Sequence, residues 1–240
     1  MLHTTDVTVP VGTPGPGGDG MPAAVYHPAT EGGAGIVLVQ EIFGRSEYLR
    51  GRASDLADLG YTVVVPQIYW RLGLDVIPEA SEDSLMTGMG AVTALDWPLA
   101  VADVRDTVAW LRGELAGEEG VALVGFCFGG GLAFAAVQDA SGPGRADALV
   151  SYYGSALPGL VDGPAVDVPS LHHFGDADAF IPADDRARIQ EVVEADGAEF
   201  HLWEGANHAF DNHLASWHHP QAAREAWEVT VEWLAEHHPY

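Results

Sequence analysis

From residue 34 onward, apolar runs of strand length alternate with segments of helical periodicity. The strand-like runs are residues 34–41, 61–67, 121–126, 147–154, 168–175 and 198–205. Runs that are apolar throughout are typical of strands buried on both faces, as in a parallel sheet. The helical patterns fall between or after them, at residues 46–59, 97–115, 129–138, 182–196 and 219–238. The alternation therefore predicts an α/β fold with a mostly parallel central sheet and helices on both faces.

The first 30 residues predict an antiparallel start to this sheet. Residues 4–11 and 23–29 have the pattern of two short strands, and the glycine-proline segment 12–20 joins them. That segment leads into a strand and lacks the lysine of a phosphate-binding loop, so we interpret it as a connection. Residues 70–95 predict a loop or short helices over an open face of the sheet, where pocket walls are often built. With no repeat and no long linker, we expect a single domain over residues 1–240.

Charge and cysteine content exclude several classes of function. The formal net charge is −25, and the sequence contains no lysine. Such a chain repels phosphate backbones and anionic lipid, so we expect neither a nucleic-acid partner nor a membrane partner. A single cysteine excludes an intramolecular disulfide and any multi-cysteine metal site, and no H-x-E or HExxH spacing occurs, so we expect no metal site. The first ten residues lack the pattern of a signal peptide, which predicts a cytoplasmic protein. The sequence leaves open whether this protein is a monomer or a homodimer.

The lone cysteine lies in a pattern that predicts a nucleophile. In VALVGFCFGGG, Cys127 follows a buried strand, precedes an apolar helix and is flanked by Gly125 and Gly129. This is the arrangement of a nucleophile elbow with cysteine in the place of serine, in which the tight turn leaves no room for neighbouring side chains. A thiol at a helix N-terminus is also favoured as thiolate. A lone cysteine among apolar residues is otherwise an inert core side chain, but the combined pattern favours catalysis.

A cysteine nucleophile needs a base and a group that orients the base. Asp178 and His208 each follow a predicted strand by a few residues, so both fall at carboxyl strand ends, where open α/β sheets gather their sites. Their chain order of nucleophile, acid and histidine is that of the elbow fold. Asp176 is the rival acid, and its position is more typical of a turn. The remaining candidate histidines lie in a strand or in the polar C-terminal region: His172, His173, His218, His219, His237 and His238.

Four motifs give the sequence a resemblance to a known family. They are QEIFG at 40–44, GFCFGG at 125–130, GDADAFIP at 175–182 and ANHAF at 206–210. With them the chain resembles the dienelactone hydrolase, or carboxymethylenebutenolidase, family of α/β-hydrolases from about residue 20 to its end. The combination of GFCFGG with QEIFG is specific, because most relatives of this fold have serine at the elbow. The resemblance implies a single-domain α/β-hydrolase fold.

The resemblance also implies catalytic roles. Cys127 corresponds to the nucleophile, His208 to the base and Asp178 to the carboxylate that orients the base. Glu41 matches an additional glutamate of the family that lies beside the thiol and helps convert it to thiolate when substrate binds. At the end of a buried strand, this glutamate is also in an unusual place for a purely solvated side chain.

The oxyanion hole implied by the resemblance is formed by the backbone N–H groups of Ile42 and Phe128. The expected activity is cysteine-dependent hydrolysis of a small ester or lactone through a thiol acyl-enzyme, without a cofactor. Two alternatives remain at this stage. One is a broad carboxylesterase or thioesterase that acts on neutral esters, and the other is a catalytically idle hydrolase fold that binds a small molecule.

The sequence departs from the family at the expected substrate carboxylate. Members that act on dienelactone hold its carboxylate with two arginines, one in the segment before the helix at 97–115 and one four residues after the catalytic histidine. Here the second position is Asn212, and no arginine occurs between Arg71 and Arg105. This departure weakens the case for an anionic substrate and predicts an aromatic pocket of lower charge. The candidate substrate contacts are Phe43, Trp70, Arg71, Tyr153, Phe180 and Asn212, and Trp97 is a further aromatic candidate.

Overall fold

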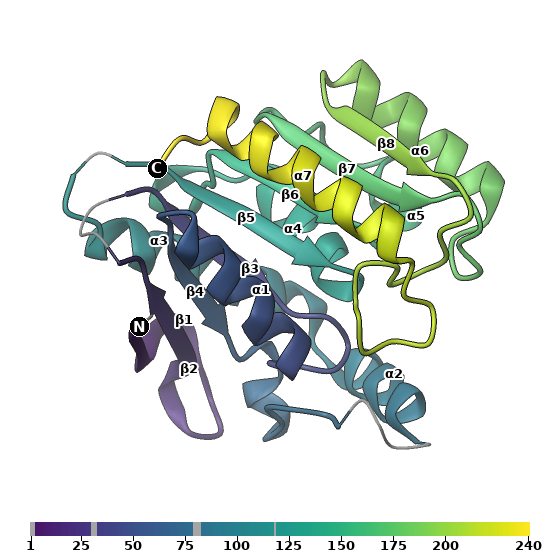
Figure 1. Ribbon diagram of the computed structural model, residues 1–240. Helices are drawn as coiled ribbons and strands as arrows, with labels where there is room; N and C mark the ends of the chain where they lie inside the picture. The colour runs from purple at the N-terminus through teal and green to yellow at the C-terminus, as the bar shows by residue number, and fades with distance from the viewer. Residues whose placement is uncertain (1–2, 30–32, 79–82, 118) are drawn as a thin grey trace.

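Eight strands form one sheet in the order β1-β2-β4-β3-β5-β6-β7-β8 (Figure 1). The computed structural model describes residues 3–29, 33–78, 83–117 and 119–240. The strands are β1 His3–Gly15, β2 Gly18–His27, β3 Gly35–Val39, β4 Thr62–Pro66, β5 Val121–Phe126, β6 Ala148–Tyr152, β7 Ser170–Gly175 and β8 Glu199–Trp203. Only the pairs β1·β2 and β2·β4 are antiparallel, and the other neighbours in this described sheet run parallel. The mostly parallel sheet predicted from the apolar runs is confirmed.

Helices connect the strands. The α-helices are α1 Glu47–Asp58, α2 Ser84–Ala94, α3 Trp97–Glu114, α4 Phe128–Val137, α5 Leu157–Leu160, α6 Ala183–Ala195 and α7 Pro220–His237, and the 3₁₀ helices are η1 Ile68–Leu72 and η2 Gly142–Gly144. In Figure 1, α1 and α7 cover one face of the sheet, and α3 and α4 cover the other, which confirms the prediction of helices on both faces.

Of the described helices, none is by itself long and apolar enough to cross a membrane; α2 and α3 reach that length and apolarity only together, across a 90° bend.

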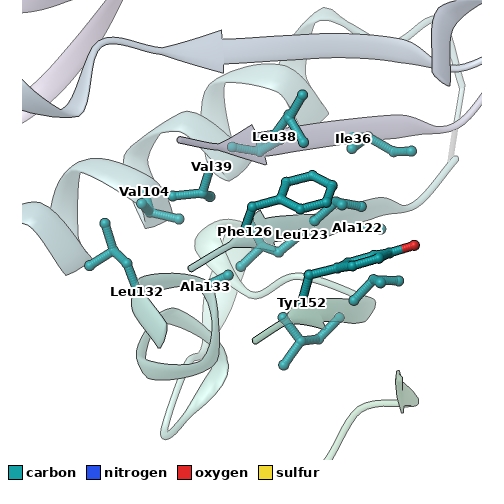
Figure 2. Close-up of a cluster of buried hydrophobic side chains, with 14 of the residues drawn as sticks. Ile36, Leu38, Val39, Val104, Ala122, Leu123, Phe126, Leu132, Ala133 and Tyr152 are labelled. Carbon is teal, nitrogen blue, oxygen red and sulfur yellow. The ribbon is translucent and has the colours of Figure 1, made fainter. Parts of the chain in front are cut away.

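The core lies on both faces of the central strands. All residues of β3 and β5 are buried, because each of these strands is apolar throughout and is covered by helices on either side. Figure 2 shows Val39 of β3, Phe126 of β5 and Leu132 of α4 among the side chains of this cluster. The rigid packing at these strands fixes the position of the turn that follows β5.

The N-terminal hairpin differs from the prediction in its length. The sequence predicts a connection over 12–20, whereas β1 continues to Gly15 and β2 begins at Gly18, so the two strands pair almost to the tip. Gly18 has a φ of 114°, a conformation that glycine adopts without steric cost. The glycine-rich composition thus serves the tight turn and the irregular pairing before it, rather than a long loop.

The segment predicted as a loop or short helices over an open face of the sheet forms helices. The sequence predicts a loop or short helices over 70–95, and the structure forms the eleven-residue helix α2 there, preceded by η1. Residues 79–82 of this prediction lie outside the described residues. The sequence of helix α2, SLMTGMGAVTA, has no charged side chain, and its polar and apolar residues do not separate onto two faces of a helix. It therefore lacks the amphipathic pattern by which a helix is recognised in a sequence. It lies beyond the ends to which the arrows of β3 and β5 point in Figure 1.

Candidate active site

The turn between β5 and α4 holds Cys127 in a strained conformation. Its φ is 54° and its ψ is −118°, and it directly precedes the first residue of α4. A Cβ atom on Gly125 would lie 2.2 Å from the carbonyl oxygen of Gly129, and one on Gly129 would lie 2.4 Å from the carbonyl oxygen of Val39. Both contacts are far inside van der Waals distance and involve backbone atoms, so the turn requires glycine on either side of Cys127.

Cys127, His208 and Asp178 form a hydrogen-bonded row. The Nε2 atom of His208 lies 3.0 Å from the Sγ atom of Cys127, and its Nδ1 atom lies 2.8 Å from Oδ2 of Asp178. All three residues are buried. They come from the carboxyl ends of three strands of the sheet, since Cys127 follows β5, Asp178 follows β7 and His208 follows β8. The arrangement matches the geometry of a nucleophile, a base and an orienting carboxylate.

Backbone hydrogen bonds select Asp178 over Asp176 as the partner of His208. The Oδ1 atom of Asp178 accepts hydrogen bonds from the N–H groups of Phe180 and Ile181 at 2.8 Å and 3.0 Å, which leaves Oδ2 directed at the imidazole. Asp176 is exposed and accepts a hydrogen bond from the N–H group of Gly205. The turn position predicted for Asp176 is the position the structure shows.

The imidazole of His208 lies in an environment that favours its protonated form. Burial by itself lowers the pKa of His208, but the negative charge of the Cys127 sulfur and the hydrogen bond to Asp178 raise it, and the net pKa is about 10. The ring of Tyr153 packs against the imidazole at 5.1 Å between centroids and shields it from water. A cation beside the sulfur stabilises thiolate, so the pair is suited to act as thiolate and imidazolium.

A small cavity opens onto the sulfur. Its volume is about 200 Å³. Besides Cys127 and His208, its lining consists of Glu41, Ile42, Phe43, Leu85, Met89, Val92, Thr93, Phe128, Ser155, Phe180, Ala209 and Trp217. Among the described residues, this lining is apolar apart from Cys127, His208, one carboxylate, two hydroxyls and the indole N–H. A site of this kind binds a small organic molecule and aligns it by a few polar groups.

The comparison with known proteins places the chain in a family. The model of the dienelactone hydrolase family matches residues 21–238. The chain belongs to the dienelactone hydrolase family. The carboxymethylenebutenolidase of Pseudomonas putida is 34% identical over 217 residues, which cover 89% of this chain and 90% of that protein. The carboxymethylenebutenolidase of Pseudomonas sp. (strain P51) is 31% identical over 221 residues, which cover 91% of each.

A solved structure shows the same fold. The crystal structure of a putative dienelactone hydrolase from Klebsiella pneumoniae superimposes with a TM-score of 0.81 at 24% identity and covers 98% of this chain and 99% of that one. The likeness confirms the α/β-hydrolase fold. As a dienelactone hydrolase family member, the protein is a hydrolase that acts on esters or lactones.

Glu41 and Asn212 of this family member contact each other beside the cavity. The Nδ2 atom of Asn212 donates a hydrogen bond of 2.9 Å to Oε2 of Glu41, and both side chains are buried. Tyr153 is also buried nearby: burial and the charge of Glu41 raise the pKa of its hydroxyl well above the ordinary value. Asn212 thus holds Glu41 by a hydrogen bond, and the ring of Tyr153 packs against the imidazole of His208. Both residues were predicted as substrate contacts, but neither is part of the described cavity lining.

Two predicted substrate contacts lie elsewhere. Trp70 and Arg71 are absent from the described lining of the cavity, because both are bound by the buried carboxylate of Asp103. Its oxygens accept hydrogen bonds from the indole N–H of Trp70 at 2.9 Å and from the Arg71 guanidinium at 2.8 Å and 3.1 Å. Arg71 also donates to the carbonyl oxygens of residues 13 and 14 in the N-terminal hairpin. Phe43 and Phe180 do line the cavity, as predicted.

The residues that hold the segment after β8, which carries His208 and Asn212, were not apparent in the sequence. Asp211 is buried and accepts two hydrogen bonds from Arg52, at 2.6 Å and 2.8 Å, as well as one from the hydroxyl of Tyr48. Asp211 lies between His208 and Asn212 in the chain, so this ion pair fixes both. The only signal in the sequence was an acidic residue beside the ANHAF motif, and nothing marked Arg52 on its helix.

The wall that α2 contributes to the cavity was not apparent in the sequence either. Leu85, Met89 and Val92 line it from this helix, and Trp217 lines it from the segment before α7. Apolar residues in an uncharged helix are indistinguishable from core residues in a sequence. In the described part of the chain, no group of three or more His, Cys, Asp or Glu side chains is placed to hold a metal ion.

Proposed function

We propose that the protein hydrolyses a small ester or lactone through a covalent thioester on Cys127. The observation that carries this proposal is the row from Cys127 through His208 to Asp178, with contacts of 3.0 Å and 2.8 Å. The cavity that opens onto the same sulfur supports it, because an ester placed there meets the nucleophile and the base together.

In the first half of the reaction, the thiolate of Cys127 attacks the ester carbonyl carbon, and the carbonyl π electrons move to the oxygen. The N–H groups of Ile42 and Phe128 stabilise that oxyanion; Phe128 is the first residue of α4, where N–H groups have no acceptor within the helix. The oxyanion then collapses, the C–O bond breaks, and the leaving oxygen takes the proton from Nε2 of His208. The products of this half are an alcohol and a thioester.

In the second half, neutral His208 removes a proton from a water molecule as the water oxygen attacks the thioester carbonyl. The tetrahedral intermediate collapses, the C–S bond breaks, and Cys127 leaves as thiolate while the carboxylic acid departs. Ester and water are thereby converted to acid and alcohol. A positioned histidine contributes on the order of a hundredfold to ten-thousandfold to such proton transfers. The position of Glu41, held by Asn212 in the wall of the same cavity, supports a role in activating the thiol.

Mass spectrometry tests this mechanism directly, because Cys127 is the only cysteine of the chain. We expect a 4-nitrophenyl ester to be turned over by the wild type and to leave, after acid quench, an acyl group on the peptide that contains Cys127. Cys127→Ala should abolish both signals while retaining the wild-type melting temperature. Turnover by Cys127→Ala, or acylation at another residue, contradicts the mechanism. Absence of any ester turnover, together with alkylation by iodoacetamide at the rate of an ordinary thiol, would indicate the idle fold.

A further inference from the structure

Among the described residues that line the cavity, His208 is the only one that can carry a positive charge. The protein has ten other histidines and ten arginines, and none of them belongs to this described lining. Three arginines of the surrounding segments are committed to aspartates: Arg45 to Asp75, Arg52 to Asp211 and Arg71 to Asp103. The carboxylate of Glu41 does line the cavity, and the whole protein carries a net charge of −25. Both charges oppose the entry of an anion.

The two sides of the cavity can be assigned to the two parts of an ester. His208 protonates the leaving oxygen, so the alcohol part lies beside its imidazole. The ring of Phe180 packs 5.0 Å from His208 and 5.3 Å from Trp217, which makes this side aromatic. The acyl part then lies along the rest of the described lining, which we call the acyl side and which includes Ile42 and residues of α2.

Helix α2 forms the acyl side. A Cβ atom on Gly88 would lie 3.0 Å from the carbonyl oxygen of Ile42, so this helix packs directly on the oxyanion segment. Leu85 and Met89 line the cavity from α2 and remain 37% and 53% exposed. Apolar surface left open beside a nucleophile is covered when an apolar acyl chain lies on it, and each CH₂ group so buried strengthens binding up to about fourfold.

We propose that the substrates are uncharged esters whose apolar acyl chain lies along α2, and that an acyl chain ending in a carboxylate is rejected. The inference rests on the thioester mechanism proposed above and names the substrate class of that site. An anionic acyl chain would place its carboxylate beside Leu85 and Met89, where the described lining offers no cation, while the carboxylate of Glu41 and the net charge of −25 repel it.

A matched pair of substrates tests this proposal. In 4-nitrophenyl hexanoate and the 4-nitrophenyl monoester of adipic acid the leaving group and the chain length are the same, and only a terminal methyl or carboxylate differs. We expect kcat/KM for the hexanoate to exceed that for the adipate roughly tenfold at pH 8 and low salt, because like charge repels the adipate and its chain lacks the terminal methyl contact. Activity should also rise from the acetate to the butyrate and the hexanoate.

Two variants of one exposed residue separate charge from size. Met89→Arg places a guanidinium on the acyl side, and we expect it to raise the adipate-to-hexanoate ratio of kcat/KM at least about tenfold. Met89→Gln has similar length without charge and should leave this ratio close to that of the wild type. Equal turnover of both esters by the wild type, abolished by Cys127→Ala, overturns the substrate class and keeps the mechanism. Turnover that survives Cys127→Ala, or no turnover of any ester, overturns the mechanism and this inference together.

Discussion

The side-chain amide of Asn212 donates a hydrogen bond of 2.9 Å to the buried carboxylate of Glu41. The Oδ1 atom of Asn212 in turn accepts the N–H of Leu214, so the amide orientation is fixed from both ends. At this position the resemblance to dienelactone-hydrolysing members predicts an arginine. A neutral amide in its place holds Glu41 without supplying a positive charge, so residue 212 positions the acid and does not bind an anion.

Replacing Asn212 should therefore impair catalysis through Glu41. Asn212→Leu keeps the volume but removes a donor from a buried carboxylate, which costs about 1–3 kcal/mol. We expect kcat/KM to fall roughly tenfold, within that range of free energy. The shape-matched Asn212→Asp places two carboxylates together and should be impaired most at high pH, where they cannot share a proton. The pH dependence of Cys127 alkylation by iodoacetamide distinguishes positioning from simple destabilisation: an unchanged profile in both variants contradicts a role through Glu41.

Asp178 and Asp176 offer a matched test of the orienting acid. Asp178→Asn preserves the shape but no longer stabilises the Nδ1–H tautomer of His208, so kcat should fall roughly a thousandfold to ten-thousandfold. Asp176→Asn changes an exposed side chain that accepts a hydrogen bond from the N–H of Gly205. We expect it to retain kcat within about twofold, since this carboxylate lies outside the hydrogen-bonded row of Cys127, His208 and Asp178. Steady-state kinetics of both variants decide between the two acids, and a larger loss in Asp176→Asn would reverse the assignment.

His172 should make the fold sensitive to acid. It is fully buried, its two ring nitrogens have no partner among the described residues, and burial lowers its pKa from 6.5 to about 3. Because the folded-state pKa lies below that of the unfolded chain, the stability contributed by the neutral ring is present above pH 6.5 and is lost as pH falls toward 3. The loss between about pH 7 and about pH 5 is about 2 kcal/mol.

Urea unfolding at these two pH values measures the effect of His172. In His172→Phe, which fits an apolar site beside Phe134, the decrease in unfolding free energy between them should be smaller by about 2 kcal/mol. The exposed His213 provides the control, and His213→Gln should retain the pH dependence of the wild type. Identical pH dependence in His172→Phe and the wild type would show that His172 does not titrate with unfolding.

The elbow glycines and a helix glycine should respond to alanine in opposite directions. In Gly125→Ala the new methyl group would lie 2.2 Å from the carbonyl oxygen of Gly129, so we expect a loss of about 3 kcal/mol or a failure to fold. Gly51 lies on α1, and a Cβ atom there would project into open space among the described residues. Gly51→Ala should raise the free energy of unfolding by up to about 1 kcal/mol, because alanine favours the helix. Thermal unfolding of the two variants is the measurement, and a stable Gly125→Ala protein would contradict the tight turn.

Features that depend on residues close together in the chain could be predicted without the structure. The apolar runs predicted the parallel strands, because a strand buried on both faces must be apolar along its length. The elbow around Cys127 was visible for the same reason, since strand, turn glycines and helix are consecutive in the chain. Motifs that follow strands likewise placed Asp178 and His208 at one edge of the sheet, where parallel topology brings them together.

Contacts between groups far apart in the chain became known only from the fold. Glu41 and Asn212 are 171 positions apart and Arg52 and Asp211 are 159 apart, so no local pattern could pair them. The sequence allowed Arg71 to reach the pocket, whereas the buried carboxylate of Asp103 holds it elsewhere. The wall that α2 adds to the cavity could not be predicted for a related reason. Its residues have no amphipathic periodicity, and their function comes from the sulfur that the fold places beside them.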